Sequence, residues 1–322
     1  MKASPGEFEL IDYFFKSKTP LRDDVSVGIG DDAAVVEVPA DQQLVLAMDT
    51  IIAGTHFFEN SPAASIGHRA LCVNLSDLAA MGATPSWFTL ALTIPQVDRE
   101  WLAEFSRGMM ELAERYSVQC IGGDTTQGKL SITIQAHGFV PRGKAILRST
   151  AQVGDAILVT GTLGGTAYAI DCVGRDQAID PSLLPDYLYP EPQIKAGMVL
   201  RQFATSMIDI SDGLAGDTQH ILTASGVGAE INCGSLPMPD ILLSTLAPEQ
   251  AWRFALMGGD DYQLCFTVPS SKVSVCQTAL KAVGVSATQI GHITATPTLK
   301  IHTPSGQPFE LPHLGFQHFR EK

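Results

Sequence analysis

Apolar residues in the first half of the chain recur at two spacings, one helical and one extended. Residues 62–81 form a long apolar stretch that Pro62 opens and Gly82 closes. Because proline is favoured at the first helical position and glycine just past the last one, this stretch predicts a helix. Further helices are predicted at 7–16 and, with Asp98 as the N-terminal cap, at 99–116. Strands are predicted at four extended runs: 43–48, 87–94, 118–121 and 130–140.

The second half of the chain repeats this alternation after a polar, turn-rich segment at 142–154. We place the domain boundary in that segment, which gives an N-terminal domain over 1–149 and a C-terminal domain over 150–322. Beyond it, strands are predicted at 155–160, 206–210 and near 264–268, and helices at 190–203 and 213–225. The pattern predicts an α/β (α+β) fold of two domains with mixed sheets and flanking helices.

Composition narrows the class of protein and its compartment. The 322 residues are 45% hydrophobic and 17% charged, which is typical of a globular protein. No apolar run reaches the roughly 18–20 residues of a membrane span, and the N-terminus does not resemble a signal peptide. The net charge of −13 disfavours nucleic acid and anionic membranes as partners. Six widely separated cysteines without a C-x-x-C pair indicate a reducing compartment, so we expect a cytoplasmic protein.

The chemically informative residues are aspartates, most of which follow a glycine or end a predicted strand. Six motifs carry them: 28–32, 48–50, 74–77, 122–126, 209–213 and 258–261. Glycine allows the backbone to turn tightly and approach a ligand, and strand ends are frequent positions of sites in α/β folds. Converging carboxylates repel one another unless cations lie between them. Ligation by oxygen alone suits magnesium better than zinc, so the motifs predict a magnesium site.

Each motif alone has a simpler interpretation. A Gly-Asp pair in a loop is usually turn chemistry, and Asp209 with Asp212 would suit helix capping before Gly213. Asp77 is harder to explain in this way, because it lies within an apolar predicted helix and shares a face with Asn74. Six such motifs in one chain favour a common function over coincidence.

Two glycine-rich segments raise the question of a phosphate-binding loop. Residues 123–129 match G-x-x-x-x-G-K, but Leu130 replaces the hydroxyl residue that holds magnesium, and a strand follows instead of a helix. We therefore reject a P-loop. Residues 161–165 are either a weak phosphate-cradling turn or a structural turn.

Together these motifs resemble the thiamine-monophosphate kinase family of the aminoimidazole ribonucleotide synthetase-like superfamily, over nearly the whole chain. The resemblance is carried by Gly6-Glu-Phe, GIGDDAA at 28–34, AGTHF at 53–57, VNLSDLAAMGA at 73–83, IGGDTT at 121–126, LRS at 147–149, IDISDGL at 208–214 and GFQHF at 315–319. It implies phosphorylation of thiamine monophosphate to thiamine diphosphate, the last step of thiamine diphosphate biosynthesis. ATP would be the co-substrate, and several Mg²⁺ ions would assist a direct in-line transfer.

The resemblance also implies roles for individual residues. The implied metal ligands are Asp32, Asp49, Asp77, Asp124, Asp209 and Asp212, of which Asp49, Asp124 and Asp212 are the expected catalytic residues. The implied ATP contacts are Gly123, Asp124, Arg148 and Ser211, and the implied substrate contacts are His56, Asp260 and Phe316. The N-terminal domain would bind ATP and metal and pair with that of a second subunit in a homodimer. The C-terminal domain would complete the active site.

Three positions depart from the family pattern. Ala47-Met48 precedes Asp49 where hydroxyl residues are frequent, so only backbone carbonyls are available there as ligands. Asp260 replaces the usual Glu, which shortens its reach, and residues 150–153 lack the lysine that often follows Arg148-Ser149.

The implied reaction needs no general base, because a phosphomonoester with a second pKa near ~6 is already ionised at neutral pH. There are four alternatives. A selenide-activating kinase would be expected to carry an early reactive cysteine, whereas the first here is Cys72. A hydrogenase-maturation relative would end in a functional cysteine, whereas this chain ends in Phe-Arg-Glu-Lys. A purine-biosynthetic ligase remains open on the fold alone. A non-enzymatic protein that binds a divalent metal or a nucleotide would show no ATP turnover.

Overall fold

The computed structural model describes residues 7–316, which divide into two compact units. Unit 1 comprises Met1–Leu78 and Ala83–Gly143, and unit 2 comprises Ala79–Gly82 and Lys144–Lys322. Gly6 and residues 317–319, which belong to two of the motifs above, lie outside the described residues.

Unit 1 is built on a four-stranded sheet with the order β3-β6-β4-β5. The strands are β3 (Gln42–Ile52), β4 (Thr84–Ile94), β5 (Gln119–Gln127) and β6 (Ser131–Pro141). Strand β6 is antiparallel to both β3 and β4, whereas β4 and β5 are parallel and are joined through α3 (Arg99–Tyr116). Before the sheet come α1 (Glu7–Ile11), the π-helical η1 (Asp12–Lys16) and a small ribbon of β1 (Val25–Val27) and β2 (Val35–Val36).

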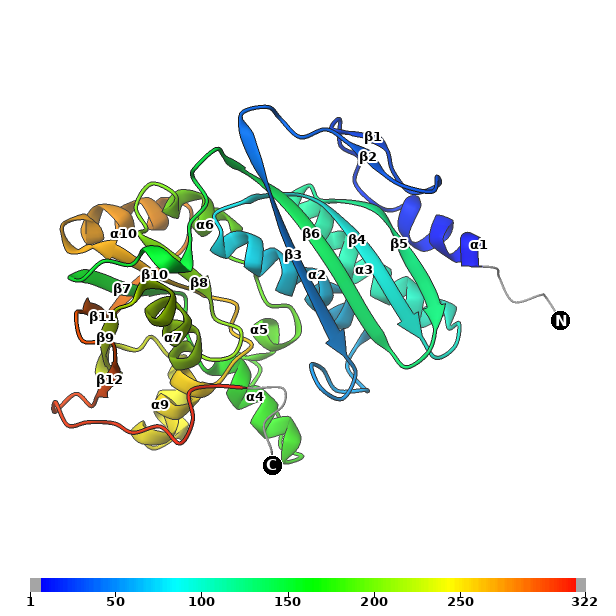
Figure 1. Ribbon diagram of the computed structural model, residues 1–322. Helices are drawn as coiled ribbons and strands as arrows, with labels where there is room; N and C mark the ends of the chain where they lie inside the picture. Colours follow the sequence, from blue (N-terminus) through cyan, green and yellow to red (C-terminus); the bar gives the residue numbers. More distant parts are fainter. Residues whose placement is uncertain (1–6, 317–322) are drawn as a thin grey trace. The chain divides into compact units, whose positions relative to one another are not determined.

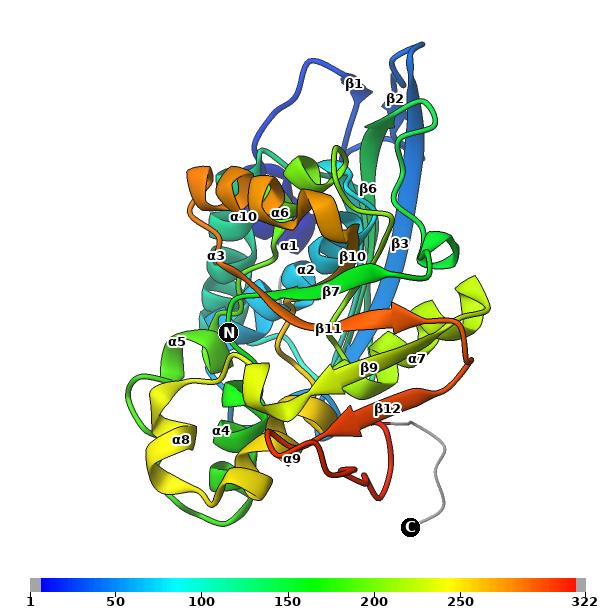
Figure 2. The same cartoon turned by 90° about the vertical axis from the view of Figure 1, so that its left-hand side faces the viewer.

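Helices α2 (Ala63–Ala80) and α3 cover one face of this sheet (Figures 1 and 2). The two helices cross at glycines. A Cβ atom on Gly67 would lie 2.0 Å from the carbonyl oxygen of Phe105, and one on Gly108 would lie 1.9 Å from that of Ala64. Because no side chain fits at either place, the glycines are what allow the helices to pack so closely.

The other face of the sheet leaves apolar side chains open to solvent. On β3, Ile51 is 4% exposed, whereas Leu46, Met48 and Ile52 are 54%, 65% and 41% exposed. Successive residues of a strand point to opposite faces, so the three exposed residues share the face away from the helices. We call these three residues the open-face patch.

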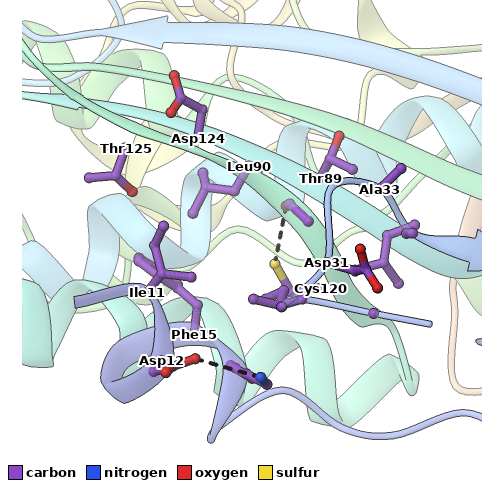
Figure 3. Close-up of a pocket in the computed structure, with 18 of the residues that line it drawn as sticks. Ile11, Asp12, Phe15, Asp31, Ala33, Thr89, Leu90, Cys120, Asp124 and Thr125 are labelled. Carbon is purple, nitrogen blue, oxygen red and sulfur yellow. Dashed lines mark hydrogen bonds and ion pairs between the residues drawn. The ribbon is translucent and has the colours of Figure 1, made fainter. Parts of the chain in front are cut away.

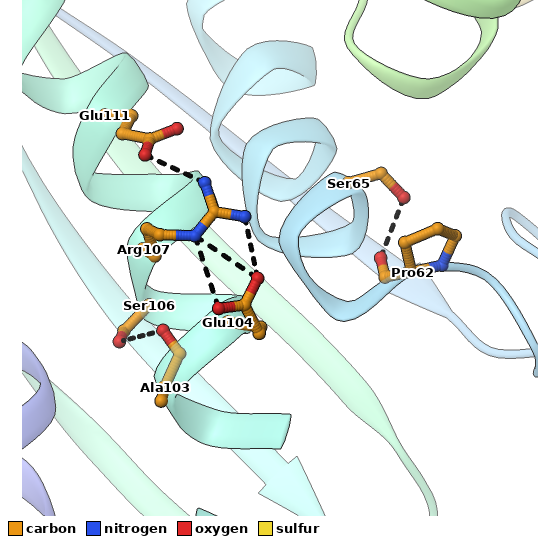
Figure 4. A network of polar contacts seen from close by, with 7 residues as sticks. All are labelled: Pro62, Ser65, Ala103, Glu104, Ser106, Arg107 and Glu111. Atoms are coloured by element: carbon orange, nitrogen blue, oxygen red, sulfur yellow. Dashed lines mark hydrogen bonds and ion pairs between the residues drawn. The ribbon is translucent and has the colours of Figure 1, made fainter. Parts of the chain in front are cut away.

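Helix α3 has the N-terminal cap that the sequence predicted. The Asp98 carboxylate accepts hydrogen bonds from two backbone N–H groups of the first turn, at 3.0 and 3.1 Å. On the exposed side of the helix, Arg107 bonds Glu104 and Glu111 at 2.7 and 2.8 Å (Figure 4). Exposed ion pairs of this kind contribute little to stability, so packing and capping define this helix.

Unit 2 is built on a six-stranded sheet with the order β12-β9-β11-β7-β10-β8. All neighbouring pairs are antiparallel except β12 and β9. The strands are β7 (Asp155–Thr160), β8 (Ser206–Asp209), β9 (Gly228–Asn232), β10 (Leu264–Pro269), β11 (Ala287–Thr294) and β12 (Leu299–His302). The helices are α4 (Gly165–Gly174), α5 (Leu184–Leu188), α6 (Ile194–Leu200), α7 (Leu214–Ser225), α8 (Asp240–Thr245), α9 (Pro248–Met257) and α10 (Val273–Ala282), with short 3₁₀ turns at η2 (Arg148–Thr150), η3 (Cys233–Ser235) and η4 (Ser270–Lys272).

The predicted class of fold is confirmed, because both units are mixed sheets with flanking helices. Several predicted boundaries are wrong. The strand predicted at 43–48 continues to Ile52 beside β6, and the helix predicted to 203 ends at Leu200. Two further differences have identifiable reasons. Strand β5 does not end at 121 but continues to Gln127 beside its parallel partner β4, so the Gly-Gly-Asp motif lies within a strand. The helix predicted at 190–203 begins only at Ile194, because Pro192 disfavours helical geometry in the residue before it. Among the described helices, none combines the length and the apolar character that a membrane span requires.

Candidate active site

Unit 1 contains a cavity of about 620 Å³ along the edge strand β5. Its walls come from α1 and η1, from the glycine and aspartate loop at 28–34, and from β4 and β5 (Figure 3). Ile11, Phe15 and Leu90 give it an apolar side, and Asp32 and Asp124 line it together with Gly123. The structure thus brings two of the predicted metal ligands and a predicted ATP contact to one cavity.

The backbone at Gly123 explains how this part of the cavity is built. Gly123 has φ +147°, and a Cβ atom there would lie 1.9 Å from the carbonyl oxygen of Leu90. Only glycine allows β5 to run this close to β4. The next residue, Asp124, is exposed. Within the described part of the chain, the carboxylates of Asp32 and Asp124 have no hydrogen-bond or salt-bridge partner.

One lysine lines the same cavity and was missed by the sequence analysis. The Lys16 ammonium lies 3.7 Å from the Asp12 carboxylate, and a Cβ atom on Gly30 would lie 2.6 Å from its Nζ. The glycine therefore makes room for the ammonium beside the 28–34 loop. In the sequence, Lys16 follows Asp12 by four residues on a predicted helix, which indicates an ion pair between them. That spacing does not show which face of the helix meets the 28–34 loop.

Asp49 and Asp77 are placed by a contact between α2 and β3, and neither lines this cavity. The Asn74 side chain accepts a hydrogen bond from the Asp49 N–H at 3.0 Å and donates to the Ala70 carbonyl at 3.0 Å. Asn74 is completely buried, so it fixes this part of β3 on the helix. Asp77 follows Asn74 by three residues and therefore lies on the same side of α2.

His56 lies in the turn after β3. Its Nδ1 atom accepts a hydrogen bond from the Ile52 N–H at 3.0 Å. A neutral imidazole that accepts at Nδ1 carries its proton on Nε2, so the Nδ1 lone pair is committed to the turn and is not available as a base.

In unit 2, Ser211 and Asp212 lie in a loop that a buried carboxylate organises. One oxygen of Asp217 accepts hydrogen bonds from the backbone N–H groups of Ser211, Asp212 and Gly213, each at 3.1 Å. Burial raises the pKa of Asp217 to about 7, and the negative charges of Asp209 and Asp212 add to this rise. Asp217 is thus the residue that satisfies the backbone N–H groups of the loop that precedes α7.

Two predicted substrate contacts join this loop. The Asp260 N–H donates to the Ser211 carbonyl at 2.8 Å, and the Phe316 N–H donates to the Asp212 carbonyl at 2.9 Å. Phe316 is 49% exposed, so much of its ring is open to a ligand. The structure thus gathers Ser211, Asp212, Asp260 and Phe316 at one place in unit 2.

Arg148 lies elsewhere in unit 2. Its carbonyl accepts from the Ser225 hydroxyl at 2.8 Å, at the C-terminal end of α7, whereas Ser211 and Asp212 precede the N-terminal end. A helix of this length spans roughly 18 Å. The backbones of two residues assigned to ATP are therefore well separated within this unit.

The glycine-rich turn at 161–165 binds a carboxylate of the protein itself. The Gly164 N–H donates to both oxygens of Asp261, at 2.9 and 3.1 Å. Asp261 is 9% exposed, and burial raises its pKa well above the usual range. Because an acidic side chain already holds the N–H group that a phosphate would need, the geometry favours a structural turn over a phosphate cradle.

The donor atoms of the aspartate motifs suit magnesium, although they do not form a closed cage. In residues 7–316, no group of three or more His, Cys, Asp or Glu side chains is arranged to hold a metal ion. Mg²⁺ is commonly held by one or two carboxylates together with water and substrate phosphates. Exposed carboxylates such as Asp32 and Asp124 fit that mode of binding, in which the ion arrives with its phosphate ligand.

Comparison with known proteins places the chain in a family. The family described as AIR synthase related protein matches residues 30–140 with its N-terminal domain and 152–303 with its C-terminal domain. The thiamine-monophosphate kinase of Escherichia coli K12 is 46% identical over 98% of both chains. The crystal structure of thiamine-monophosphate kinase from Stenotrophomonas maltophilia K279a has a TM-score of 0.86 at 40% identity and covers 94% of this chain and 97% of its own.

A further solved structure, described as AaThiL complexed with AMPPCP and TMP, has a TM-score of 0.77 at 29% identity. It covers 98% of this chain and 97% of its own. The family match extends over most of the chain, and these relatives align over 94–98% of it at 29–46% identity. The chain therefore belongs to the AIR synthase related proteins and, within them, to the thiamine-monophosphate kinase family.

Proposed function

We propose that the protein transfers the γ-phosphoryl group of ATP to thiamine monophosphate, which yields thiamine diphosphate and ADP. The observation that carries the proposal is the unit 1 cavity, where Asp32, Gly123 and Asp124 come together in a chain of this family. The relative solved with AMPPCP and TMP supports the same pair of substrates.

The cavity suits the polyanion ATP on condition that cations accompany it. Asp32 and Asp124 are exposed carboxylates, and the protein carries a net charge of −13. Alone they would repel ATP. With Mg²⁺ bound, they would attract its phosphates, because the ion neutralises charge on both sides. Lys16 adds a fixed positive charge at the same wall, and the apolar side formed by Ile11 and Phe15 suits a nucleobase.

The remaining predicted metal ligands keep their assignment in this proposal. In unit 1, Asp49 and Asp77 would be Mg²⁺ ligands, and Asn74 fixes the strand that carries Asp49. In unit 2, Asp209 and Asp212 would be Mg²⁺ ligands. The Arg148 guanidinium would donate two parallel hydrogen bonds to ATP. The Ser211 hydroxyl would also contact ATP.

The cluster of unit 2 suits the organic part of the substrate. Thiamine carries a cationic thiazolium ring and an amino-bearing pyrimidine ring. Phe316 offers an aromatic face on which a cationic ring stacks, and the Asp260 carboxylate accepts hydrogen bonds from amino groups. His56 remains the third proposed substrate contact, through its Nε2 side.

The proposed step is an in-line displacement. An oxygen of the substrate phosphate forms a bond to the γ-phosphorus, and the bond to the oxygen that bridges the β- and γ-phosphates breaks, which releases ADP. The attacking oxygen is already ionised at neutral pH, so no side chain has to remove a proton. The protein contributes positioning and neutralisation of charge, which are the main requirements of phosphoryl transfer.

We further propose a homodimer that pairs the N-terminal domains through the open-face patch. Leu46, Met48 and Ile52 expose apolar side chains on the sheet face away from α2 and α3. Exposed apolar side chains that gather on one face mark interaction sites. Sedimentation analysis should show a dimer that Met48→Lys weakens, while a monomeric wild-type protein would contradict the pairing.

The function is tested by offering thiamine monophosphate or free thiamine with ATP and Mg²⁺ and identifying the products by mass. Thiamine diphosphate should form from the monophosphate, and free thiamine should give no product. The alcohol of thiamine needs a base to lose its proton, and the proposed site offers none. Formation of thiamine monophosphate from free thiamine at a comparable rate would contradict the mechanism.

A further inference from the structure

The loop at 258–262 holds two residues in a backbone conformation that L-amino acids rarely adopt. Asp260 has φ +71° and Tyr262 has φ +49°. Aspartate tolerates the left-handed region, but for a bulky aromatic residue it is an outlier. Backbone strain of this kind persists only where the surroundings enforce it, and it concentrates at functional sites.

Three contacts enforce the conformation. The Asp260 N–H donates to the Ser211 carbonyl at 2.8 Å, and the Tyr262 N–H donates to the Ile210 carbonyl at 2.9 Å. A side chain does not fit at Gly259, because a Cβ atom there would lie 2.1 Å from the Ser211 carbonyl oxygen. The backbone of the loop is therefore clamped to the residues that precede Asp212.

The strained geometry brings the two side chains together. The Tyr262 hydroxyl donates a hydrogen bond to Oδ1 of Asp260 at 2.6 Å, and Tyr262 is only 7% exposed. A hydrogen bond from a neutral donor to an ionised carboxylate is short and strong. A buried phenol on a clamped backbone thus restricts the orientation of the Asp260 carboxylate.

We propose that Tyr262 is a positioning residue that holds Asp260 in the orientation that recognises the amino-bearing, cationic part of the substrate. The inference rests on the proposed function and deepens it, because it names the residue on which substrate recognition depends. Tyr262 acts through Asp260 and does not contact the nucleotide. Removal of its hydroxyl therefore weakens binding of thiamine monophosphate and leaves binding of ATP unchanged.

The test is Tyr262→Phe, which removes one oxygen atom and keeps the buried ring. The KM for thiamine monophosphate should rise about tenfold, the typical effect of losing one hydrogen bond to a charged group. The KM for ATP should stay unchanged, and kcat should change less than about twofold, because the positioned carboxylate binds the substrate in both the ground state and the transition state.

Asp260→Asn gives a second variant that leaves Tyr262 in place. It should raise the same KM selectively, and Tyr262→Phe added to Asp260→Asn should have little further effect, because the two residues act as one unit. Tyr168→Phe is the matched control. Tyr168 belongs to α4 and packs its ring against Phe254 at 5.4 Å, so loss of its hydroxyl should leave both KM values unchanged.

The outcomes separate the two proposals. If wild-type protein forms no thiamine diphosphate, the proposed function fails and the inference falls with it. If wild-type protein is active but Tyr262→Phe leaves the KM for thiamine monophosphate unchanged, only the inference is overturned. A parallel rise of both KM values with a lower melting temperature would also overturn it, because that result indicates a purely structural role for the phenol.

Discussion

Two aspartates of unit 1 and two aspartates of unit 2 occupy opposite environments. In unit 1, Asp32 and Asp124 are exposed, line a cavity and have no partner among the described residues. In unit 2, Asp217 and Asp261 are buried and accept hydrogen bonds from backbone N–H groups. The first pair is open to a ligand, whereas the second pair is used by the fold.

The cost of burying charge explains this division. A carboxylate can be buried only where donors replace its lost water, and even then its pKa rises, as it does for Asp217 and Asp261. An exposed carboxylate keeps its water and its charge. Such a group is suited to bind Mg²⁺ together with a phosphate, because the ion arrives partly hydrated.

The strongest test of this comparison removes an open carboxylate. We expect Asp124→Ala to lower turnover about a thousandfold, because loss of one electrostatic contact in a preorganised site has effects of this size. The free energy of unfolding should change by less than about 0.5 kcal/mol, since the side chain is exposed. Activity assays and urea unfolding measure the two quantities.

Asp23→Ala is the matched control, because Asp23 is also exposed in unit 1 and does not line the cavity. It should leave turnover unchanged. Near-normal activity of folded Asp124→Ala would mean that the open carboxylates of unit 1 do not serve the reaction.

A buried carboxylate should show the opposite behaviour, an effect on stability that depends on pH. The raised pKa means that folded protein keeps Asp261 protonated at pH values where the unfolded chain, with a pKa near ~3.9, has lost the proton. This contribution to stability is full below the unfolded pKa and is lost as pH rises towards the folded value. Within that window it changes by up to about 1.4 kcal/mol per pH unit.

Asp261→Asn stays neutral at every pH and keeps an oxygen for the Gly164 N–H. Relative to wild type, its free energy of unfolding should therefore increase as the pH is raised from 4 to 8. Glu310→Gln, an exposed change in the same unit, serves as the control. A difference between Asp261→Asn and wild type that is independent of pH would contradict the assignment of Asp261 as a buried, neutral acid.

Asp98 is intermediate between the open and the buried carboxylates. It is exposed, yet it accepts hydrogen bonds from two backbone N–H groups at the start of α3. Asp98→Ala should lower the free energy of unfolding by about 1 kcal/mol, as expected for loss of an N-terminal cap. Its kinetic constants should stay at wild-type values. A large loss of activity in this variant would show that partnered aspartates also serve the reaction.

The sequence predicted the elements whose signals are local. Asp98 as a cap and the alternating pattern of 130–140 report on neighbouring residues alone, and helix α3 and strand β6 agree with them. It failed where a distant segment decides the outcome. Strand β5 runs past 121 because β4 lies beside it, and no property of the Gly-Gly-Asp segment itself indicates this.

The same limit applies to the candidate site. Motifs identified Asp32 and Asp124, which the structure then places in one cavity. The supporting residues were not visible in the sequence, since Asp217 and Tyr262 matter through contacts with backbone and side chains that only folding brings near. The residues of a motif can be identified from the sequence, whereas the residues that orient them are identified only from the tertiary structure.

The central claim is that exposed aspartates act through magnesium in phosphoryl transfer to thiamine monophosphate. The direct test follows thiamine diphosphate by mass while the metal is removed with EDTA and then restored. We predict that product formation stops with EDTA and returns with Mg²⁺, whereas Ca²⁺ restores binding better than rate because its coordination is looser. Continued formation of thiamine diphosphate in excess EDTA would contradict the account.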